Sequence, residues 1–565
     1  MKFPLLLAFL CANTFAALPW YHGRPYPGSS TQGGVWPLPH SIKYDTYNHT
    51  INPGQFHFTS KIGACDVVDK AIARYQKLAF PLYDPASYSD LPATLTTLSI
   101  SVTKGCDTTP PQLEMDESYT LVVDRIKGIA NLAATEVWGA LRGLETFSQL
   151  IYQPTKNQYR VRTASVTDKP RFPHRGTLID TARHFISLPV ILQHLDVMSQ
   201  NKMDVLHWHI VDSESFPYTS AKFANMSLLF LRSTDFKGAY TLAHIYSIAD
   251  IKKVMDYARL RGIRVVPEFD TPGHSGSWGK SIPNLLPTCY NGIGTVDQLP
   301  DIIDPTLSSN FEFLSEFFAE ALALFQDNYM HFGGDEVAGD MQQCWINNKE
   351  VNKRMKAMGY TNAKELLNYY WQTLFGLIDK DRPGTKKIVW QEVLDMKINV
   401  TNAVAHVWKG NTLDAIMHEM ATVTAAGHHA ILSSCWYLDL IKYGADWGYI
   451  DENPVDGIKS RGKYYECDPT DFKGTADQKA LVLGGEAALW GEFVDGTNFM
   501  TRMWPRASAV AERLWSDAAQ TKSADAAWPR LHEFRCRMMN RGFAVEPPNA
   551  PDYCPFEWNP SYQEL

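Results

Sequence analysis

Two adjacent carboxylates follow two glycines in the hexapeptide His331–Glu336. A positioned carboxyl group can donate and accept a proton during a reaction, so Asp335 and Glu336 are candidates for acid–base chemistry. Neighbouring residues of an extended strand point to opposite sides, so the two carboxylates form one pair only if the backbone twists. Gly333 and Gly334 permit such a twist and would let a substrate approach the backbone closely. The alternative is an acidic pair that opens the next helix.

The hexapeptide ends one of eight short apolar runs that recur after the proline-rich stretch 169–173. Amphipathic helical patterns lie between several of them, one over 251–258 that stops at Gly262 and another over 311–325. Strands that alternate with helices in this way predict a (β/α)8 barrel, with an open doubly wound sheet as the alternative. Nearly every run ends in Asp, Glu, Trp or His, which favours the barrel, whose strand ends form the catalytic face. The runs are Gly176–Asp180, Val205–Asp212, Val265–Asp270, Tyr329–Glu336, Ile388–Glu392, Val404–Trp408, Ala430–Asp439 and Leu481–Glu492.

The segment before the proline-rich stretch has a different pattern. Tyr119–Asp124 resembles a strand, and apolar residues over 134–147 have helical spacing. We therefore expect a smaller α+β accessory domain over 18–170, followed by an α/β catalytic barrel with a C-terminal extension over 171–565.

The first 17 residues carry one early cation, an apolar run and small residues at the end, the pattern of a cleaved secretory signal peptide. Sequons at Asn48, Asn225 and Asn399 are candidate glycosylation sites and agree with a secretory route, to a lysosomal or extracellular location. Eight cysteines remain once Cys11 leaves with the signal, and an even number in an oxidising compartment predicts disulfides. Spacing alone leaves their pairing open. No Cys/His cluster has zinc spacing, so no metal is expected.

Composition limits the class of protein and its partners. The chain has 565 residues, 45% hydrophobic and 20% charged, which is typical of a globular protein. The formal net charge of −8 and the lack of a basic block argue against nucleic acid and anionic membranes as partners. No apolar stretch after the signal is long enough to span a bilayer. The 16 tryptophans suit stacking on sugar rings, although tryptophan more often belongs to a core.

The stretch His331–Val337, HFGGDEV, resembles the catalytic signature of glycoside hydrolase family 20, the β-N-acetylhexosaminidases. Two N-terminal blocks, 35–39 and 137–147, resemble the accessory domain of that family. Further blocks follow in family order through the barrel: 180–184, 207–212, 268–274, 390–393, 407–409, 436–440 and 489–495. Within the family, the pair Asp439-Leu440 resembles the β-type subunit of the animal lysosomal enzymes.

The resemblance implies an exo-acting enzyme that removes terminal β-linked N-acetylglucosamine or N-acetylgalactosamine from an oligosaccharide or glycoconjugate, with retention and without a cofactor. In this family the 2-acetamido oxygen of the substrate replaces the carboxylate nucleophile of most retaining glycosidases. By resemblance, Glu336 is the general acid and then the base that activates water. Asp335 holds the acetamido N–H and balances positive charge, and Tyr437 donates a hydrogen bond to the acetamido carbonyl.

The remaining site residues follow from the resemblance in three groups. Three indoles enclose the acetamido methyl group and stack under the sugar: Trp390, Trp408 and Trp490. Three polar side chains bind sugar hydroxyls: Arg183, Glu492 and Asp439. Two support the acid: Asp212 and His274. His207 and His209 alternate in one run, and packing inside the barrel is favoured over a metal site for this pair.

The family also implies disulfides Cys65–Cys106, Cys289–Cys344 and Cys536–Cys554. Cys435 and Cys467 are unusual for the family, and a fourth disulfide between them would brace the wall of the site. The stretch 448–463 is longer and more polar than the corresponding family loop. Relatives pair through the barrel domain, so a homodimer is expected. Because Asp439 would repel anions, we expect weak activity on a 6-sulfated N-acetylglucosaminide.

Two other functions are alternatives for the same sequence. One is a secreted sugar-binding protein that keeps the pocket without turnover; the intact Asp335-Glu336 pair and Tyr437 count against it, because a lectin needs no general acid. The other is a β-glucosidase that uses a carboxylate nucleophile on sugars without an acetamido group.

Overall fold

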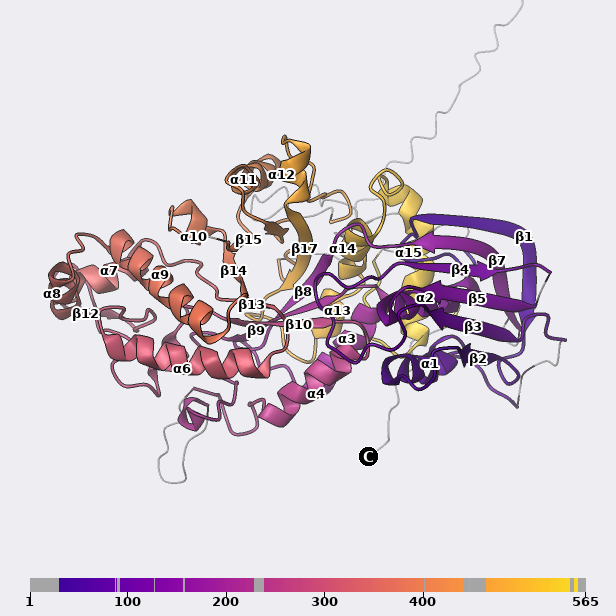
Figure 1. Cartoon of the computed structure of the whole chain (residues 1–565), viewed down its shortest axis with the longest axis horizontal. Coiled ribbons are helices and arrows are strands. Elements are labelled where there is room, and N and C mark those ends of the chain that lie inside the picture. Colours follow the sequence, from indigo (N-terminus) through magenta and orange to yellow (C-terminus); the bar gives the residue numbers. More distant parts are fainter. Residues whose placement is uncertain are drawn as a thin grey trace, which may run out of the picture.

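The computed structural model describes residues 30–556 except for 87, 89–91, 127, 156–157, 228–237, 401, 441–446, 448–463 and 549–552 (Figure 1). The expected signal peptide and the polar stretch 448–463 therefore lie outside the described residues.

Eight parallel strands close into a barrel, which confirms the expected fold. All eight apolar runs contribute a strand: β8 (His174–Asp180), β9 (Val205–Val211), β10 (Arg264–Phe269), β13 (Tyr329–His331), β14 (Lys386–Trp390), β15 (Val404–Val407), β16 (Ala430–Leu432) and β17 (Val482–Leu489). The barrel closes where β17 pairs with β8. The register sets Glu268 of β10 opposite both His209 of β9 and His331 of β13, so these three residues lie at one level of the barrel.

Helices surround the barrel between successive strands (Figure 1). The two that the apolar spacing predicts are α4 (Ile248–Arg259) and α6 (Ser308–Leu324). Helix α4 begins at a capping box between Ser247 and Asp250, because each side chain accepts a hydrogen bond from the backbone of the other. The other longer helices of the barrel domain are α3 (Leu188–Gln200), α9 (Ala363–Asp381), α11 (Leu413–Ala425), α14 (Arg506–Trp515) and α15 (Ala524–Asn540).

Short helices occupy the loops after the strands and the C-terminal part of the domain. They are η1 (Ala224–Met226), α5 (Gly276–Gly279), α7 (Asp340–Asn347), α8 (Lys349–Ala357), α10 (Glu392–Asp395), α12 (Ala476–Ala480) and α13 (Phe499–Met503), together with the small hairpin of β11 (Cys289–Tyr290) and β12 (Val296–Gln298). Among the helices of the described ranges, none has the length and apolar character that crossing a bilayer requires.

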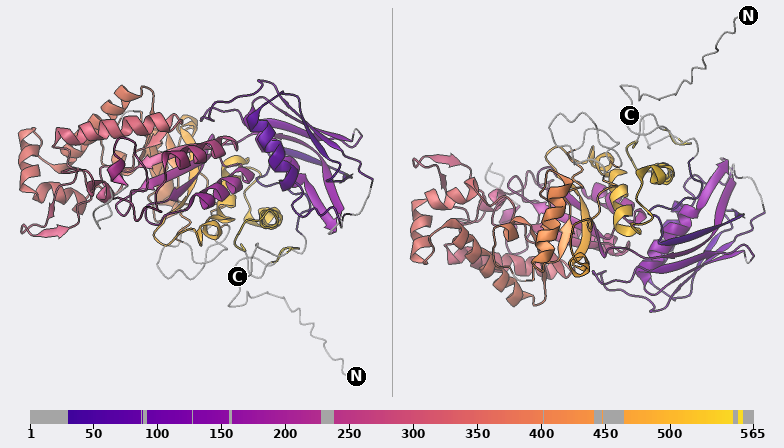
Figure 2. Two further views of the ribbon diagram at one scale, coloured as in Figure 1. Left: turned by 90° about the horizontal axis from the view of Figure 1, so that it is seen from below. Right: turned by 90° about the horizontal axis from the view of Figure 1, so that it is seen from above.

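The N-terminal domain is a seven-stranded sheet with two helices packed on it (Figure 2). The strand order is β1 (Ser41–Ile51), β7 (Gln158–Asp168), β4 (Tyr119–Val123), β5 (Ile129–Ala134), β3 (Thr97–Val102) and β2 (His57–Ser60), with β6 (Ile151–Thr155) paired to β7. The helices are α1 (Asp66–Leu78) and α2 (Val137–Leu150). Every residue of α2 is buried, because its second face is turned toward the barrel domain.

The two domains are joined by residues 169–173, between the end of β7 and the start of β8. Glu117 accepts hydrogen bonds from Arg142 of α2 at 2.7 Å and from Arg175 of β8 at 2.6 Å, with all three side chains buried. Buried ions are stable only when they are paired and hydrogen-bonded, so this triad fixes α2 against the base of the barrel.

Four disulfides connect the eight described cysteines: the three pairs that the resemblance implied, and the fourth bridge, Cys435–Cys467, that was considered for the two cysteines unusual in the family. Cys435 precedes Trp436 and Tyr437, so this bridge ties the segment after β16 to residues beyond the undescribed stretch. Of the sequon asparagines, Asn225 and Asn399 are exposed and Asn48 is half-buried on β1.

Candidate active site

The loop after β13 carries the adjacent carboxylates in a sharply turned backbone. Strand β13 ends at His331, and φ is positive at Gly333, Gly334 and Glu336. A Cβ atom at Gly333 would lie only 1.7 Å from Oδ1 of Asp270, so glycine is required there. The twist expected from the two glycines is therefore present. The alternative of a helix cap is wrong, because α7 begins four residues later, with Gly339 at its N-cap.

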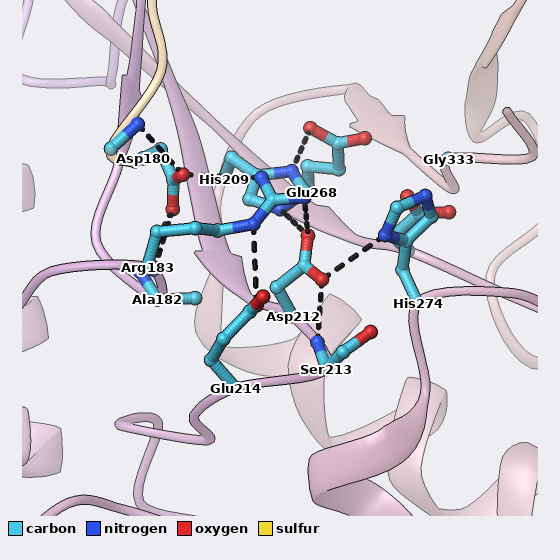
Figure 3. A network of polar contacts seen from close by, with 12 residues as sticks. Asp180, Ala182, Arg183, His209, Asp212, Ser213, Glu214, Glu268, His274 and Gly333 are labelled. Carbon is cyan, nitrogen blue, oxygen red and sulfur yellow. Dashed lines mark hydrogen bonds and ion pairs between the residues drawn. The ribbon is translucent and has the colours of Figure 1, made fainter. Parts of the chain in front are cut away.

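His274 lies between the two carboxylates and a buried aspartate. Its Nδ1 is 3.1 Å from Oδ1 of Asp212 (Figure 3). Its Nε2 is 3.6 Å from Oε2 of Glu336 and 3.9 Å from Oδ2 of Asp335. His274 Nε2 and Asp335 Oδ1 are two of several buried side-chain atoms of the described residues that have no hydrogen-bond partner. Buried polar atoms are usually paired, so these two atoms point to the place where a polar ligand would bind.

Burial and neighbouring charges shift the pKa values of the acidic residues around this loop in opposite directions. Burial lowers the pKa of His274, but the carboxylates of Asp212 and Asp335 outweigh it and raise the pKa well above the ordinary value. His274 in turn lowers the pKa of Glu336, which leaves this half-exposed acid ionised in the ligand-free site. Burial, followed by the Asp335 carboxylate, raises the pKa of Asp270 well above its usual range. The neutral form of Asp270 is therefore favoured beside the Asp335 carboxylate.

Arg183 follows β8 and is held by three acids. Its guanidinium lies 3.1 Å from Asp180, 2.8 Å from Asp212 and 3.3 Å from Glu214 (Figure 3). It also lies 5.2 Å from the ring centre of Trp490. A guanidinium anchored on several sides keeps one orientation, so its remaining N–H groups can bind ligand oxygens at defined positions.

Four aromatic side chains gather at the C-terminal ends of the last four strands. Trp390 ends β14, Trp408 follows β15, Tyr437 lies beyond β16 and bridges to Ala488, and Trp490 follows β17. They belong to one apolar cluster, in which Trp490 is 5.9 Å from Trp390 and 6.5 Å from Tyr437, and Trp408 is stacked on Tyr437 at 6.3 Å. The barrel thus unites residues that are 100 positions apart in the sequence.

The two remaining expected residues lie at the rim of this aromatic cluster. Oδ1 of Asp439 accepts a hydrogen bond from the backbone N–H of Trp490 at 3.5 Å. Glu492 is exposed beyond Trp490, and its charge acts on Arg183. Every site residue predicted from the sequence is therefore found at the C-terminal face of the barrel, where parallel strands carry active sites.

A cavity of about 890 Å³ opens beside Glu336. Its wall includes the charged side chains of Glu214, Lys280 and Asp301 and the apolar side chains of Leu286 and Met341. A ligand bound at Glu336 therefore has room to extend away from the carboxylate loop.

Several buried polar residues that support the site were not predicted from the sequence. Glu268, Asp270 and Asp180 lie within the family-like blocks but had no predicted role, and His209 was predicted only to pack inside the barrel. The usable signal was the spacing of His207 and His209, since residues two apart in a strand share a face. Here that face is the barrel interior, as expected.

Some of these interior side chains lie close enough to one another to hold a metal ion. The sets are His207, His406 and Glu486; His207, Glu268 and His331; and Asp270, His274 and Asp335. His207 already lies 2.7 Å from Glu486 and 3.0 Å from Glu268 through its two nitrogens. A metal at either set that contains His207 would have to displace these hydrogen bonds.

Comparison with known families decides the class of the protein. The model of the glycosyl hydrolase family 20 catalytic domain matches residues 172–518, and a domain described as beta-acetyl hexosaminidase like matches 35–150. The chain belongs to glycosyl hydrolase family 20. It is a glycoside hydrolase, and the carboxylate loop lies within the family's catalytic domain.

Relatives in family 20 match almost the whole chain. Beta-hexosaminidase A of Caenorhabditis elegans is 44% identical, over 98% of this chain and 97% of the relative. The beta-hexosaminidase subunit beta of Homo sapiens is 41% identical, over 98% of both chains. Among solved family 20 structures, Flavobacterium johnsoniae chitobiase superposes with a TM-score of 0.73 at 26% identity, over 90% of this chain and 73% of the chitobiase.

Proposed function

We propose that the protein is an exo-acting retaining β-N-acetylhexosaminidase that removes terminal, non-reducing β-linked GlcNAc or GalNAc from glycoconjugates. The reaction would proceed by substrate-assisted catalysis through an oxazolinium intermediate. The observation that carries the proposal is the position of His274, whose Nε2 is 3.6 Å from Glu336 and 3.9 Å from Asp335. The His274 imidazolium thus lies beside both carboxylates, to which we assign different roles in the reaction.

Glu336 acts first as the acid and then as the base. It protonates the glycosidic oxygen as the bond to C1 breaks, and the leaving group departs into the cavity beside Glu336. Because His274 lowers the pKa of Glu336, the free enzyme must gain a proton there before turnover, which favours acidic conditions. The resulting carboxylate then removes a proton from the water that attacks C1.

Asp335 and the aromatic cluster act on the acetamido group. Its carbonyl oxygen attacks C1 from the face opposite the leaving group, while Asp335 accepts the amide N–H and stabilises the positive charge of the oxazolinium ring. Tyr437 donates a hydrogen bond to the same carbonyl oxygen. The methyl group is enclosed by the indoles of Trp390, Trp408 and Trp490, which also exclude water. The enclosure favours the folded conformation of the acetamide and protects the intermediate from bulk solvent.

Three polar residues select the terminal sugar. Arg183, fixed by its acidic partners, and Glu492 bind the hydroxyls at C3 and C4, and Asp439 makes a further hydroxyl contact. Contacts to these hydroxyls require an unsubstituted non-reducing end, which gives exo action.

The proposal is tested by chromophore release from a β-N-acetylglucosaminide and from the matching β-glucoside, for the wild type and for Glu336→Gln. We expect the wild type to hydrolyse only the acetamido substrate, and Glu336→Gln to lose about 10²–10⁴-fold in kcat/KM, the usual contribution of a positioned acid. Equal turnover of the glucoside would refute participation of the acetamide. No release from either substrate would favour the sugar-binding alternative.

The sequence patterns of a signal peptide and sequons support a cellular location, and the word subunit in the relatives' names supports an oligomer. We propose passage through the secretory pathway, to a lysosomal or extracellular location, and a homodimeric state. Sedimentation equilibrium of the purified protein at a mass of one chain would refute the dimer.

A further inference from the structure

Glu268 of β10 has its side chain inside the barrel, below the described site, and is fully buried. Its Oε1 accepts a hydrogen bond from Nε1 of Trp390 at 2.7 Å, and its Oε2 lies 2.7 Å from Nδ1 of His209. His207 and His331 approach the same carboxylate at 3.0 Å and 3.2 Å. The carboxylate therefore contacts residues from three neighbouring strands, β9, β13 and β14.

His209 connects Glu268 to Asp212, which in turn contacts His274 beside the catalytic loop. Its Nε2 lies 2.8 Å from Oδ2 of Asp212, so both ring nitrogens face carboxylates (Figure 3). An imidazole donates from both nitrogens only when it is protonated. Burial lowers the pKa of His209, but Glu268 and Asp212 outweigh it and raise the pKa well above the ordinary value. Its other close neighbour is the ring of Trp490, 5.0 Å away and edge-on.

One carboxylate oxygen of Asp212 contacts the His209 ring, and the other contacts His274, which lies beside Glu336. Oδ2 is shared by His209 and by Arg183 at 2.8 Å, and Oδ1 lies 3.1 Å from His274. The charges consequently alternate in sign from Glu268 through His209, Asp212 and His274 to Glu336. Each member of such a buried network is oriented by its neighbours, so the far end influences the near end.

We propose that Glu268 and His209 are positioning residues that couple the two halves of the site. Through His209 and Asp212 they orient His274 against Glu336, and through Trp390 the same carboxylate orients one wall of the acetamide enclosure. The inference rests on the proposed function and extends it to residues that do not touch the substrate. A carboxylate is required at position 268, because an amide offers one acceptor oxygen to two N–H donors on different strands.

The first test uses the dependence on the leaving group. Protonation by Glu336 matters for a sugar leaving group but little for dinitrophenolate, which leaves without it. We expect His209→Gln to lose about tenfold or more in kcat/KM on an N-acetylglucosamine disaccharide, and less than about threefold on the dinitrophenyl N-acetylglucosaminide. A purely structural role would lower both values alike, and this result, or no loss from a folded variant, would overturn the inference.

A matched control comes from the same barrel. His174 of β8 is equally buried and lies 2.6 Å from Glu486, but it contacts neither Glu268 nor Asp212. We expect His174→Asn to alter thermal stability while its activities on the two substrates keep the wild-type ratio. Preferential loss on the disaccharide in this control as well would show that any defect in the barrel core has this effect, and would overturn the inference.

The second test addresses the coupling to Trp390. We expect Glu268→Gln to bind an N-acetylglucosamine thiazoline, which mimics the cyclised acetamide, about tenfold more weakly, since a loss of about 1.4 kcal/mol is tenfold. If Glu268→Gln does not fold, Glu268→Asp withdraws both oxygens by one methylene and carries the same expectation. Unchanged thiazoline affinity in the folded variant would overturn this half of the inference.

Glu336→Gln separates the inference from the function on which it rests. If Glu336→Gln loses kcat/KM equally on both leaving groups, the acid role of Glu336 fails, and with it the premise. If Glu336→Gln shows the expected dependence while His209→Gln does not, the function stands and the positioning role of His209 alone is rejected.

Discussion

At the scale of single residues, one imidazolium sets the state of the catalytic acid. His274 is held by Asp212 at 3.1 Å and lowers the pKa of Glu336. Activity requires protonated Glu336, so kcat/KM should fall as the pH rises through this pKa. Removing the cation raises the pKa of Glu336. We therefore expect His274→Asn to move the alkaline limb of the pH–kcat/KM profile to higher pH and to lower the rate at the optimum by about 10- to 100-fold.

A control variant on the protein surface checks this prediction. His418 is exposed on α11, and His418→Asn should leave the profile of kcat/KM against pH unchanged. An alkaline limb of His274→Asn that stayed in place, or moved to lower pH, would contradict the assigned electrostatics.

Charge at Asp439 should decide whether sulfated sugars are accepted. Its carboxylate lies beside the backbone of Trp490 at the rim of the aromatic cluster. Charges about 4 Å apart near a protein surface interact by about 4 kcal/mol, and 1.4 kcal/mol is a factor of ten. We expect Asp439→Arg to raise the ratio of 6-sulfated to unsulfated N-acetylglucosaminide turnover by about tenfold or more, with Asp439→Asn between the two. An unchanged ratio would show that the 6-position lies elsewhere.

At the scale of elements, the conformation of the loop after β13 requires glycine at position 334, where the backbone is packed against buried side chains. Gly334 has φ of 105°, and a Cβ there would lie 2.5 Å from Val393 and 2.7 Å from Trp371. Overpacking costs about 1–3 kcal/mol, and a backbone with positive φ adds about 1–3 kcal/mol for a residue with a side chain. We expect Gly334→Ala to reduce the free energy of unfolding by about 2–6 kcal/mol, more than Gly339→Ala, and to displace the carboxylates, with a loss of kcat.

Gly339 in the same loop provides a matched control. Its φ is 69°, but a Cβ there would meet no atom within 4 Å. Gly339→Ala should therefore cost only the backbone contribution, which is about 1–3 kcal/mol, in chemical denaturation. Equal losses in the two variants would mean that crowding by Val393 and Trp371 is unimportant.

At the scale of the whole molecule, a buried acid connects the accessory domain to the barrel. Glu117 pairs with Arg142 and Arg175, and its side chain is only 2% exposed. Removing one partner of a buried ion pair costs about 3–5 kcal/mol, because the remaining charges stay buried. We expect Glu117→Ala to lose this much stability in urea while kcat of the folded fraction changes little, since Arg175 lies near the start of β8 and the site lies beyond its end.

The pair Lys104–Glu136 in the same domain, in which the Lys104 side chain is 65% exposed, serves as the comparison. Lys104→Ala should barely change the urea midpoint, because exposed ion pairs are screened by water. A loss in Glu117→Ala no larger than that in Lys104→Ala would contradict the role of the buried triad.

Much of this protein is determined by its sequence. The eight apolar runs predicted the eight strands, because each run is buried on both faces and ends at the same edge of the barrel. The pair Asp335-Glu336 after two glycines was likewise visible, since its chemistry depends on adjacent residues. Only the tertiary structure decided how these residues are supported. The register of β10 against β9 and β13 sets Glu268 level with His209 and His331. Such a contact arises from barrel closure, and no local periodicity of the chain encodes it.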